Sequence, residues 1–299
     1  MTESKVRRKS NLRWGVEQRL EFIEFRLYWE GRMNRRDLMN QFGVSVNQAS
    51  TDLNRYLRLA PENMVYDKSA RTYVRTSVFS PLFFKEDADN YLDQLRAVSE
   101  GSMDQEDAWI FTYPAYDGVP KPTRIVNPET LQAVVEAMRR KRTIEILYQS
   151  LSRPEPRWRW VYPHAVGFDA YRWHVRAHCE DTGAFKDFLL ARIVAIGDEE
   201  RDSECDPADD RDWHEYVELQ IGPHPGLSES QKRVIELDYG MHDGSVGLRV
   251  RRAFLFYTLK RLGLDGHETE RDPAGQHIVL LNRERLAGVI PSEDDRESD

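Results

Sequence analysis

Apolar residues recur at helical spacing at the start of the chain. A helix is predicted over residues 16–30 by four positions on one face: Leu20, Ile23, Leu27 and Tyr28. Gly31 ends that helix, and Asn34 is a suitable N-cap for a short second helix over residues 34–41. Gly43 follows, and its conformational freedom favours a tight turn before the next element.

A third helix is predicted from the stretch SVNQASTDLNRYLRLA, which Ser45 opens as N-cap. Its apolar stripe, which we expect to be buried, consists of Val46, Ala49, Leu53, Tyr56 and Leu57. Its outward face holds Asn47, Gln48, Ser50, Thr51, Asn54 and Arg55. Two short strands around Val65 and Tyr73 then flank the turn DKSAR, which predicts a hairpin wing with Lys68 and Arg71.

Helix, short helix, glycine turn, polar-faced helix and basic hairpin are the parts of a winged helix-turn-helix, here over residues 1–79. Asn and Gln side chains pair with adenine and Arg with guanine, while a basic wing contacts the phosphate backbone. The alternative is a three-helix packing module with a polar surface helix. The sequence favours DNA binding through Ser45, Asn47, Gln48, Ser50, Thr51, Asn54, Arg55, Lys68 and Arg71.

The middle of the chain changes to short strands. Residues 80–127 are predicted to be a helical and irregular connector, and residues 128–140 a helix with Pro128 in its first turn. Four strand patterns separated by turn residues then follow: TIEILYQSLS, RWVYPHAVGF, RWHVRAHC and FKDFLLARIVAI. Short antiparallel strands of this kind predict a small β-barrel or a strongly bent sheet within residues 128–200.

The stretch YRWHVRAHC alternates two kinds of side chain along one predicted strand. One face, which we expect to be core, carries Tyr171, Trp173, Val175, Ala177 and Cys179. The opposite face carries a row of cations and potential cations without an acidic residue: Arg172, His174, Arg176 and His178. Such a row suits an anionic ligand. The alternative is a surface strand whose arginines pair with Asp and Glu residues elsewhere in the chain.

The last third of the chain predicts a separate layer. Residues 201–214 form an acidic stretch that we expect to be a solvated linker. Residues 215–290 follow the order strand, helix, strand, helix, strand, which predicts a small α+β domain. Residues 291–299 are predicted to be a disordered tail. The fold class is therefore α+β with several domains.

Charge is distributed unevenly around a net value of −8. Residues 1–80 carry 15 basic and 9 acidic residues, a balance of +6, and the remainder has a balance of −14. A basic head on an acidic body favours a polyanionic partner at one end. The two cysteines suggest a reducing cytoplasm, and the sequence contains neither a secretory signal pattern nor a run of about 18 apolar residues, so we expect no membrane span.

These motifs resemble known bacterial regulators. The stretch GVSVNQASTDLNRYL is similar to the winged heads of deoR-like repressors. The strands resemble the WYL-domain family in four patterns: Tyr148-x-Ser150, Tyr162-Pro163-His164, Arg172-Trp173-His174-Val175 and Phe188-x-Leu190-x-Arg192-Ile193. The Trp-Tyr-Leu triplet that gives the family its name stands here as Trp173-His174-Val175, which places an imidazole where a phenol is commoner.

The resemblance covers nearly the whole chain and is closest to the BrxR and CapW type, which is encoded beside phage-defence systems. It implies a small Sm-like β-barrel for the WYL domain and a C-terminal α+β extension that forms the dimer. It also implies a cytoplasmic homodimeric repressor that binds an inverted-repeat operator in double-stranded DNA. A nucleotide or nucleic-acid effector is then expected to relieve operator binding.

The same resemblance places a ligand site on the cationic face of the barrel. Period-two alternation puts Tyr148, Ser150 and Ser152 on one face of the first strand. His164 is expected to end the second strand and Arg192 the fourth. Guanidinium groups and hydroxyls match phosphate oxygens, so the predicted ligand bears phosphate. The predicted ligand residues are Tyr148, Ser150, Ser152, His164, Arg172, His174, Arg176 and Arg192.

Metal and catalytic sites find little support in the sequence. His174 and His178 stand about 13 Å apart on an extended strand, too far to share a zinc ion, and Cys179 points to the other face. The sequence shows no carboxylate cluster for metal-dependent hydrolysis and no glycine-rich phosphate loop. We therefore expect no cofactor and no enzyme activity. The remaining alternative is a nucleic-acid-processing enzyme that uses the winged head only for docking.

Overall fold

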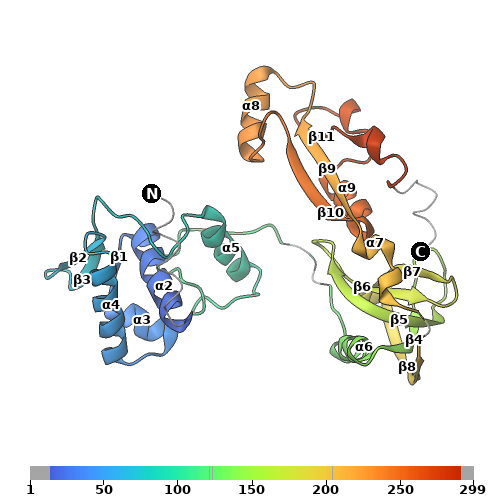
Figure 1. Ribbon diagram of the computed structural model, residues 1–299, viewed down its shortest axis with the longest axis horizontal. Coiled ribbons are helices and arrows are strands. Elements are labelled where there is room, and N and C mark those ends of the chain that lie inside the picture. Colours follow the sequence, from blue (N-terminus) through green and yellow to red (C-terminus); the bar gives the residue numbers. More distant parts are fainter. Residues whose placement is uncertain (1–13, 121, 123, 204, 291–299) are drawn as a thin grey trace. The chain divides into compact units, whose positions relative to one another are not determined.

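The computed structural model describes residues 14–120, 122, 124–203 and 205–290 (Figure 1). Contacts divide the chain into two compact units, with the boundary along the sequence after residue 122. The predicted disordered tail at 291–299 lies outside the described residues. Within the described part, no helix is both long and apolar enough to cross a bilayer.

The first unit contains the predicted winged helix-turn-helix. Its helices are α2 (Trp14–Glu30), α3 (Arg35–Phe42) and α4 (Val46–Leu59). A small antiparallel sheet follows the order β1-β3-β2, with β1 (Arg32–Met33), β2 (Met64–Asp67) and β3 (Thr72–Arg75). The shared core buries side chains from every helix, among them Phe22, Leu38 and Tyr56. Burial of these apolar surfaces is the main stabilising term for so small a unit.

Local signals in the sequence fix the ends of α3 and α4. Asn34 and Asp37 form a capping box, in which each side chain accepts a hydrogen bond from the backbone N–H of the other. Gly43 adopts φ +62° and ends α3, a conformation that costs glycine little. The Ser45 hydroxyl then accepts from the Gln48 N–H and begins α4. The turn between α3 and α4 is thus set by local interactions.

A buried carboxylate joins α2 to α4 and to the chain after the wing. Glu24 is fully buried and accepts hydrogen bonds from the Tyr56 hydroxyl and from the backbone N–H groups of Leu82, Phe83 and Phe84. Burial raises the pKa of Glu24, and these donors oppose that rise. The network holds α4 at a defined angle to α2.

The connector packs against the winged unit. It contains α5 (Ala88–Ser99), as the helical start of the connector predicts. Phe25 of α2 lies in a hydrophobic cluster with Phe84 and Ile110, and its ring stacks on Tyr91 of α5 at 6.2 Å between centroids. Residues 80–116 therefore extend the first core and are more than a spacer.

The second unit begins with α6 (Pro128–Arg140), which packs on a five-stranded antiparallel sheet. Its order is β7-β6-β5-β4-β8, formed by β4 (Arg142–Tyr148), β5 (Arg157–Phe168), β6 (Trp173–Cys179), β7 (Ala184–Leu189) and β8 (Ile193–Asp202). The predicted fourth strand is two strands, because a 3₁₀ turn at Leu190–Arg192 separates β7 from β8. Among the described residues no ladder joins β7 to β8, so a closed Sm-like barrel is not confirmed.

The C-terminal part has the predicted order of elements. It consists of β9 (Tyr216–Pro223), α8 (Glu229–Asp238), β10 (Val246–Arg251), α9 (Leu255–Leu262) and β11 (Ile278–Leu280). The sheet order is β10-β9-β11, and one face of β9 buries Val217, Leu219 and Ile221. A short helix, α7 (Arg211–His214), precedes this sheet.

Candidate DNA-binding and ligand sites

Helix α4 exposes the side chains of Asn47, Thr51 and Asn54 to solvent, whereas Arg55 is half-buried. Ala49, Leu53 and Tyr56 are buried, which confirms most of the predicted stripe. Val46 was expected in that stripe but is 47% exposed, because it stands in the first turn, at the open end of the helix. The buried stripe therefore begins at Ala49.

Three of the predicted base-reading side chains keep their hydrogen-bonding capacity. Within the described residues, Asn47, Asn54 and Arg55 have no side-chain hydrogen bond or ion pair. The Thr51 hydroxyl donates to the Asn47 carbonyl at 2.8 Å, a bond internal to the helix. These four residues offer amide, guanidinium and hydroxyl groups on one helix, as base-edge recognition requires.

Gln48 and Ser50 are engaged by their neighbours. The Gln48 side chain donates to the fully buried Asp52 carboxylate at 3.0 Å, and Arg19 donates to the same oxygen at 2.7 Å. Arg35, from the start of α3, donates to the Ser50 hydroxyl at 3.1 Å. The exposed Arg35 is thus a further cation beside α4 that the sequence reading did not select. The paired arginines at the start of the second predicted helix were the available signal.

The wing presents its cations outward. The Asp67 carboxylate accepts from the backbone N–H groups of Ser69 and Ala70, which holds the turn between β2 and β3. Lys68 and Arg71 are both exposed. Arg71 adopts φ +53°, in the left-handed region. The wing therefore offers two positive charges on a turn fixed by its own backbone contacts.

Strand β6 differs from its predicted alternation. Val175, Ala177 and Cys179 are buried as expected, but Tyr171 and Trp173 are about half exposed. The cationic side is covered as well, with His174 at 2% and Arg176 at 6% exposed. The prediction of an open cationic face was wrong for these two positions.

C-terminal elements cover that side of β6. The Tyr257 ring of α9 lies 4.8 Å from the His174 ring between centroids. The Phe254 ring packs so closely on Gly167 of β5 that a Cβ there would overlap it. The absence of a side chain at Gly167 is what permits this approach. The WYL sheet and the C-terminal part are therefore packed together at this edge.

Arg176 is neutralised inside the protein. Its guanidinium donates two hydrogen bonds to Asp210, at 2.7 and 2.9 Å, and lies 3.4 Å from Asp187. Asp210 is 1% exposed, so the linker predicted to be solvated is buried at this residue. His164 Nε2 lies 2.9 Å from the same carboxylate. Burial would raise the pKa of Asp210, but Arg176 and then His164 lower it.

Asp169 engages a second pair of predicted ligand residues. Its carboxylate accepts from Arg172 Nε at 2.9 Å and lies 3.0 Å from His174 Nε2. Burial alone would raise the pKa of Asp169, but hydrogen bonds from His174, Arg172 and two backbone N–H groups lower it to about 2. Asp169 is therefore ionised at neutral pH and offsets one positive charge.

The remaining predicted ligand residues do not share a strand face. Strand β4 ends at Tyr148, whose hydroxyl accepts from the Leu189 N–H at 3.3 Å. Ser150 and Ser152 lie in the following loop, with their hydroxyls 2.7 Å apart, because the alternation stops with the strand. His164 lies within β5 at a register shift, and Arg192 lies in the 3₁₀ turn. Among the eight residues, Arg172 and His174 share Asp169, whereas His164 and Arg176 share Asp210.

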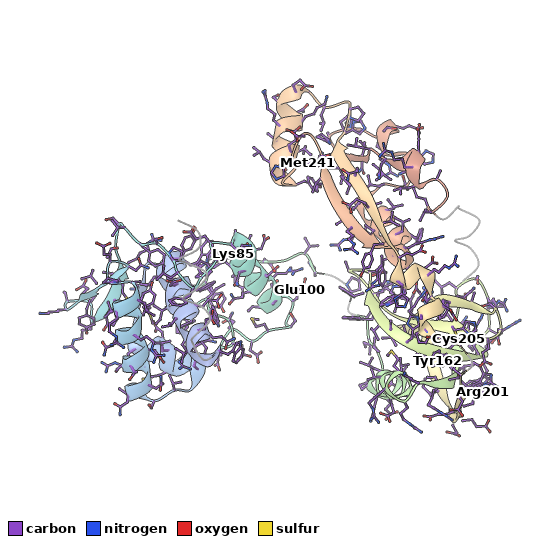
Figure 2. The ribbon with its side chains drawn as sticks, in the orientation of Figure 1. Lys85, Glu100, Tyr162, Arg201, Cys205 and Met241 are labelled. Carbon is purple, nitrogen blue, oxygen red and sulfur yellow. The ribbon has the colours of Figure 1, made fainter. Side chains whose placement is uncertain are left out.

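The linker also covers part of β5. Tyr162 of β5 and Cys205 of the linker lie near each other, as Figure 2 shows. Burial raises the pKa of Tyr162, and the nearby Cys205 and Asp206 raise it further.

In the part of the chain that the structure describes, no group of three His, Cys, Asp or Glu side chains has a geometry that could hold a metal ion.

Three family models match the chain in succession. Residues 15–97 match the winged helix-turn-helix domain of the BrxR transcriptional regulator, and residues 129–197 match the WYL domain. Residues 216–286 match the C-terminal dimerization domain of the BrxR transcriptional regulator. A solved chain titled proteasome accessory factor B/C of Arthrobacter aurescens is 16% identical to this chain, with a TM-score of 0.26. The match covers 91% of this chain and 48% of that chain, and it is too weak to support a conclusion.

Curated relatives match over nearly their full length. A protein of Stenotrophomonas maltophilia named DNA-binding transcriptional repressor CapW is 39% identical, over 93% of both chains. Proteins of the same name from Escherichia coli and Pseudomonas aeruginosa are 35% and 38% identical, over 94% of both chains. The order of the three matched domains and this similarity together show that the chain belongs to the BrxR and CapW family of winged-helix, WYL-domain regulators.

Proposed function

We propose that this chain is a cytoplasmic, homodimeric repressor that binds an inverted-repeat operator in double-stranded DNA. The observation that carries the proposal is the open polar face of α4, where Asn47, Asn54 and Arg55 have no partner in the described chain, beside a basic wing. Relatives at 35–39% identity are named DNA-binding transcriptional repressors. The match to a dimerization domain supports two heads per molecule.

The reading surface in this proposal consists of α4 and the wing. Asn47, Thr51, Asn54 and Arg55 contact base edges, while Lys68 and Arg71 contact phosphates. Ser45, Gln48 and Ser50 hold the helix end and its polar face in place through their own hydrogen bonds. Direct reading and positioning are thus divided among the predicted residues.

The regulatory part of the proposal is that the WYL domain senses a phosphate-bearing effector, a nucleotide or a nucleic-acid segment, and that sensing relieves repression of a phage-defence operon. Support comes from the resemblance to regulators encoded beside such systems. Two sites coupled in this way change each other's affinity by the same factor. Arg176, His164 and His174 contribute to the fold, because their partners are the protein's own carboxylates.

A mobility-shift assay with the DNA upstream of the gene tests the proposal. We expect a shift by low concentrations of the full chain that specific competitor DNA abolishes and unrelated DNA does not. Size-exclusion chromatography with light scattering should give the mass of a dimer. DNA that is cut in the presence of Mg²⁺ would instead support the processing-enzyme alternative. Binding without sequence preference would contradict the proposal.

A further inference from the structure

A hollow of about 420 Å³ lies where the WYL domain meets the C-terminal part of the second unit. Its lining comes from three segments: the chain before α6, the loop between β5 and β6, and α9. The lining residues with charge or an aromatic ring are Arg124, Asp169, Tyr171, Arg172, Tyr257, Lys260 and Arg261. Four of these are cations, and Asp169 is the single carboxylate among them.

The cations of this hollow differ from those on β6 in exposure and in partners. Arg124, Lys260 and Arg261 are exposed, and among the described residues none has a carboxylate within ion-pair distance. Only Arg172 is paired, with Asp169. The lining therefore carries a net charge of about +3 at neutral pH, because Asp169 with its lowered pKa is ionised and offsets one of the four positive charges.

Aromatic contacts arrange these charges around the hollow. The Arg124 guanidinium lies 4.7 Å from the centroid of the Tyr171 ring, and the Arg172 guanidinium lies 5.9 Å from that of Tyr257. A guanidinium over a ring keeps its hydrogen-bonding edge available for a ligand. The volume is within the range of sites for small ligands.

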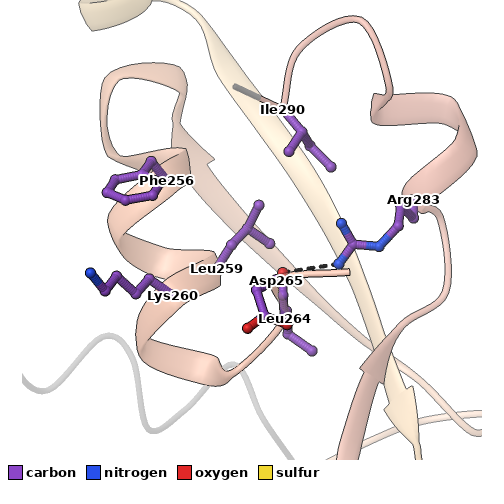
Figure 3. A pocket seen from close by; sticks show the side chains of 7 residues that line it. All are labelled: Phe256, Leu259, Lys260, Leu264, Asp265, Arg283 and Ile290. Atoms are coloured by element: carbon purple, nitrogen blue, oxygen red, sulfur yellow. Dashed lines mark hydrogen bonds between the residues drawn. The ribbon is translucent and has the colours of Figure 1, made fainter. Parts of the chain in front are cut away.

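In a neighbouring hollow, by contrast, charged side chains are paired with one another or with nearby groups of the protein. It measures about 300 Å³ and is lined by residues of α9 and the C-terminal segment, including Lys260, Asp265 and Arg283 (Figure 3). Arg283 donates to the Leu264 carbonyl and to Glu268, at 2.9 and 2.8 Å, and Asp265 pairs with Arg271. Figure 3 shows the Lys260 side chain pointing away from Arg283. This hollow offers little charge to an anion.

We infer that the hollow lined by Arg124, Arg172, Lys260 and Arg261 binds the phosphate groups of the effector, an inference that rests on the proposed function. Guanidinium forks pair with phosphate oxygens two at a time, and a net charge of +3 suits a polyphosphate or successive phosphodiesters. A mononucleotide and a short single strand share this chemistry.

The position of Arg124 gives the site a route to the DNA-binding unit. Arg124 stands two residues after residue 122, where the first unit ends. Lys260 and Arg261 belong to α9, within the segment that matches a dimerization domain. A phosphate group bound by both sides draws the start of the second unit toward α9. Ligand binding thereby changes the freedom of the chain that leads to the winged unit.

The experiment uses the full chain bound to its upstream DNA. Three ligands are titrated: ATP, a ten-nucleotide thymidine oligonucleotide, and adenosine, which lacks phosphate. Release of the duplex is followed by mobility shift, and direct binding of each ligand is measured by calorimetry. The test variant is Arg124→Ala/Arg261→Ala, and the control is Arg233→Ala, which removes an exposed arginine from α8, away from the hollow.

We expect ATP or the oligonucleotide, but not adenosine, to bind and to release the duplex. The double variant should bind the duplex as the wild type does without ligand, yet need at least tenfold more ligand, since two of the four phosphate-binding cations are gone. Arg233→Ala should respond like the wild type. Activity of ATP alone identifies a nucleotide effector, and activity of the oligonucleotide alone identifies a nucleic-acid segment.

Two results would overturn the inference. One is a double variant that responds at the ligand concentration of the wild type. The other is a wild type that binds neither phosphate-bearing ligand. The proposed function is tested separately, by the mobility shift without ligand. If the wild type does not shift its upstream DNA but binds ATP through Arg124 and Arg261, the proposed repressor function is wrong and the inferred phosphate site is still supported.

Discussion

Helix α4 and strand β6 both carry a row of polar side chains beside an apolar row, yet their polar rows have opposite surroundings. On α4, Asn47 and Asn54 face solvent without a partner in the described chain. On β6, His174 and Arg176 are buried against the carboxylates of Asp169 and Asp210. Periodicity identifies the residues that share a face, but the rest of the chain decides what covers that face.

The difference has a topological cause. Helix α4 lies at the surface of a small unit, where its apolar side already meets α2 and α3. Strand β6 lies inside a sheet whose second side receives the linker and α9. Asp210 is 34 residues from Arg176 in the sequence, so a local pattern around β6 cannot reveal it. An open polar face can form hydrogen bonds with water or a partner, whereas the polar groups of a covered face need partners within the protein.

Arg176→Ala should have the largest effect on the β6 side of this comparison. It removes the guanidinium that neutralises the buried Asp210 carboxylate, and breaking a buried pair in this way costs about 3–5 kcal/mol of folding free energy. Urea denaturation followed by circular dichroism measures the loss. Arg176→Ala/Asp210→Asn is the control. It also removes the negative charge of Asp210, so it should recover part of the stability. A loss below about 1 kcal/mol would mean that the pair is not structural.

Asn47→Ala and Arg55→Ala test the other side of the comparison. Each should weaken operator binding by about 1–3 kcal/mol per lost base contact and leave the unfolding free energy unchanged, because neither side chain has a partner among the residues that the structure describes. Fluorescence anisotropy with labelled operator measures the affinity. Gln48→Ala is the matched control. The Gln48 amide donates a hydrogen bond to Asp52, so this variant should lower the unfolding free energy more than it changes the preference for the operator sequence. Full affinity in both variants would show that α4 is not the reader.

Asp169→Asn should change how the unfolding free energy depends on pH, because it removes the Asp169 carboxylate. The pKa of Asp169 in the folded chain is about 2, below its ordinary value of 3.8. Its stabilisation is therefore fully present above pH 4 and is lost as pH falls through 2. The shift corresponds to about 2 kcal/mol at neutral pH. Unfolding free energy measured between pH 2 and 6 should decline less steeply in the variant than in the wild type, and equal slopes would contradict this assignment.

Much of the architecture was accessible from local signals. The Asn34 cap, the glycine turn at Gly43 and the Ser45 cap are all formed as the sequence predicts, because each depends on residues a few positions apart. The order of elements from β9 to β11 was also predictable, since each has its own hydrophobic period and turn.

Features that depend on distant residues were not predictable in this way. The stretch FKDFLLARIVAI reads as one apolar strand, and only the pairing of β7 with β6 and of β8 with β4 reveals the turn at Leu190–Arg192. The acidic composition of the linker predicts that it is solvated. Nothing in that composition distinguishes Asp210, the carboxylate that is buried and accepts hydrogen bonds from Arg176. The basic hollow joins three segments that are 45 positions (Arg124 to Asp169) and 85 positions (Arg172 to Tyr257) apart, so no local pattern marks it.

The smallest predicted effect concerns the wing. Lys68 is exposed at the hairpin turn and contacts phosphate in the proposed complex, so Lys68→Ala should weaken binding by a similar small factor on every DNA sequence. The plot of log affinity against log salt concentration should become shallower by about 0.9. Lys85→Ala is the charge control, because Lys85 already pairs with Asp87 and lies outside the hairpin. If the wing acts like β6 and serves the fold alone, Lys68→Ala and Lys85→Ala will give the same salt slope as the wild type.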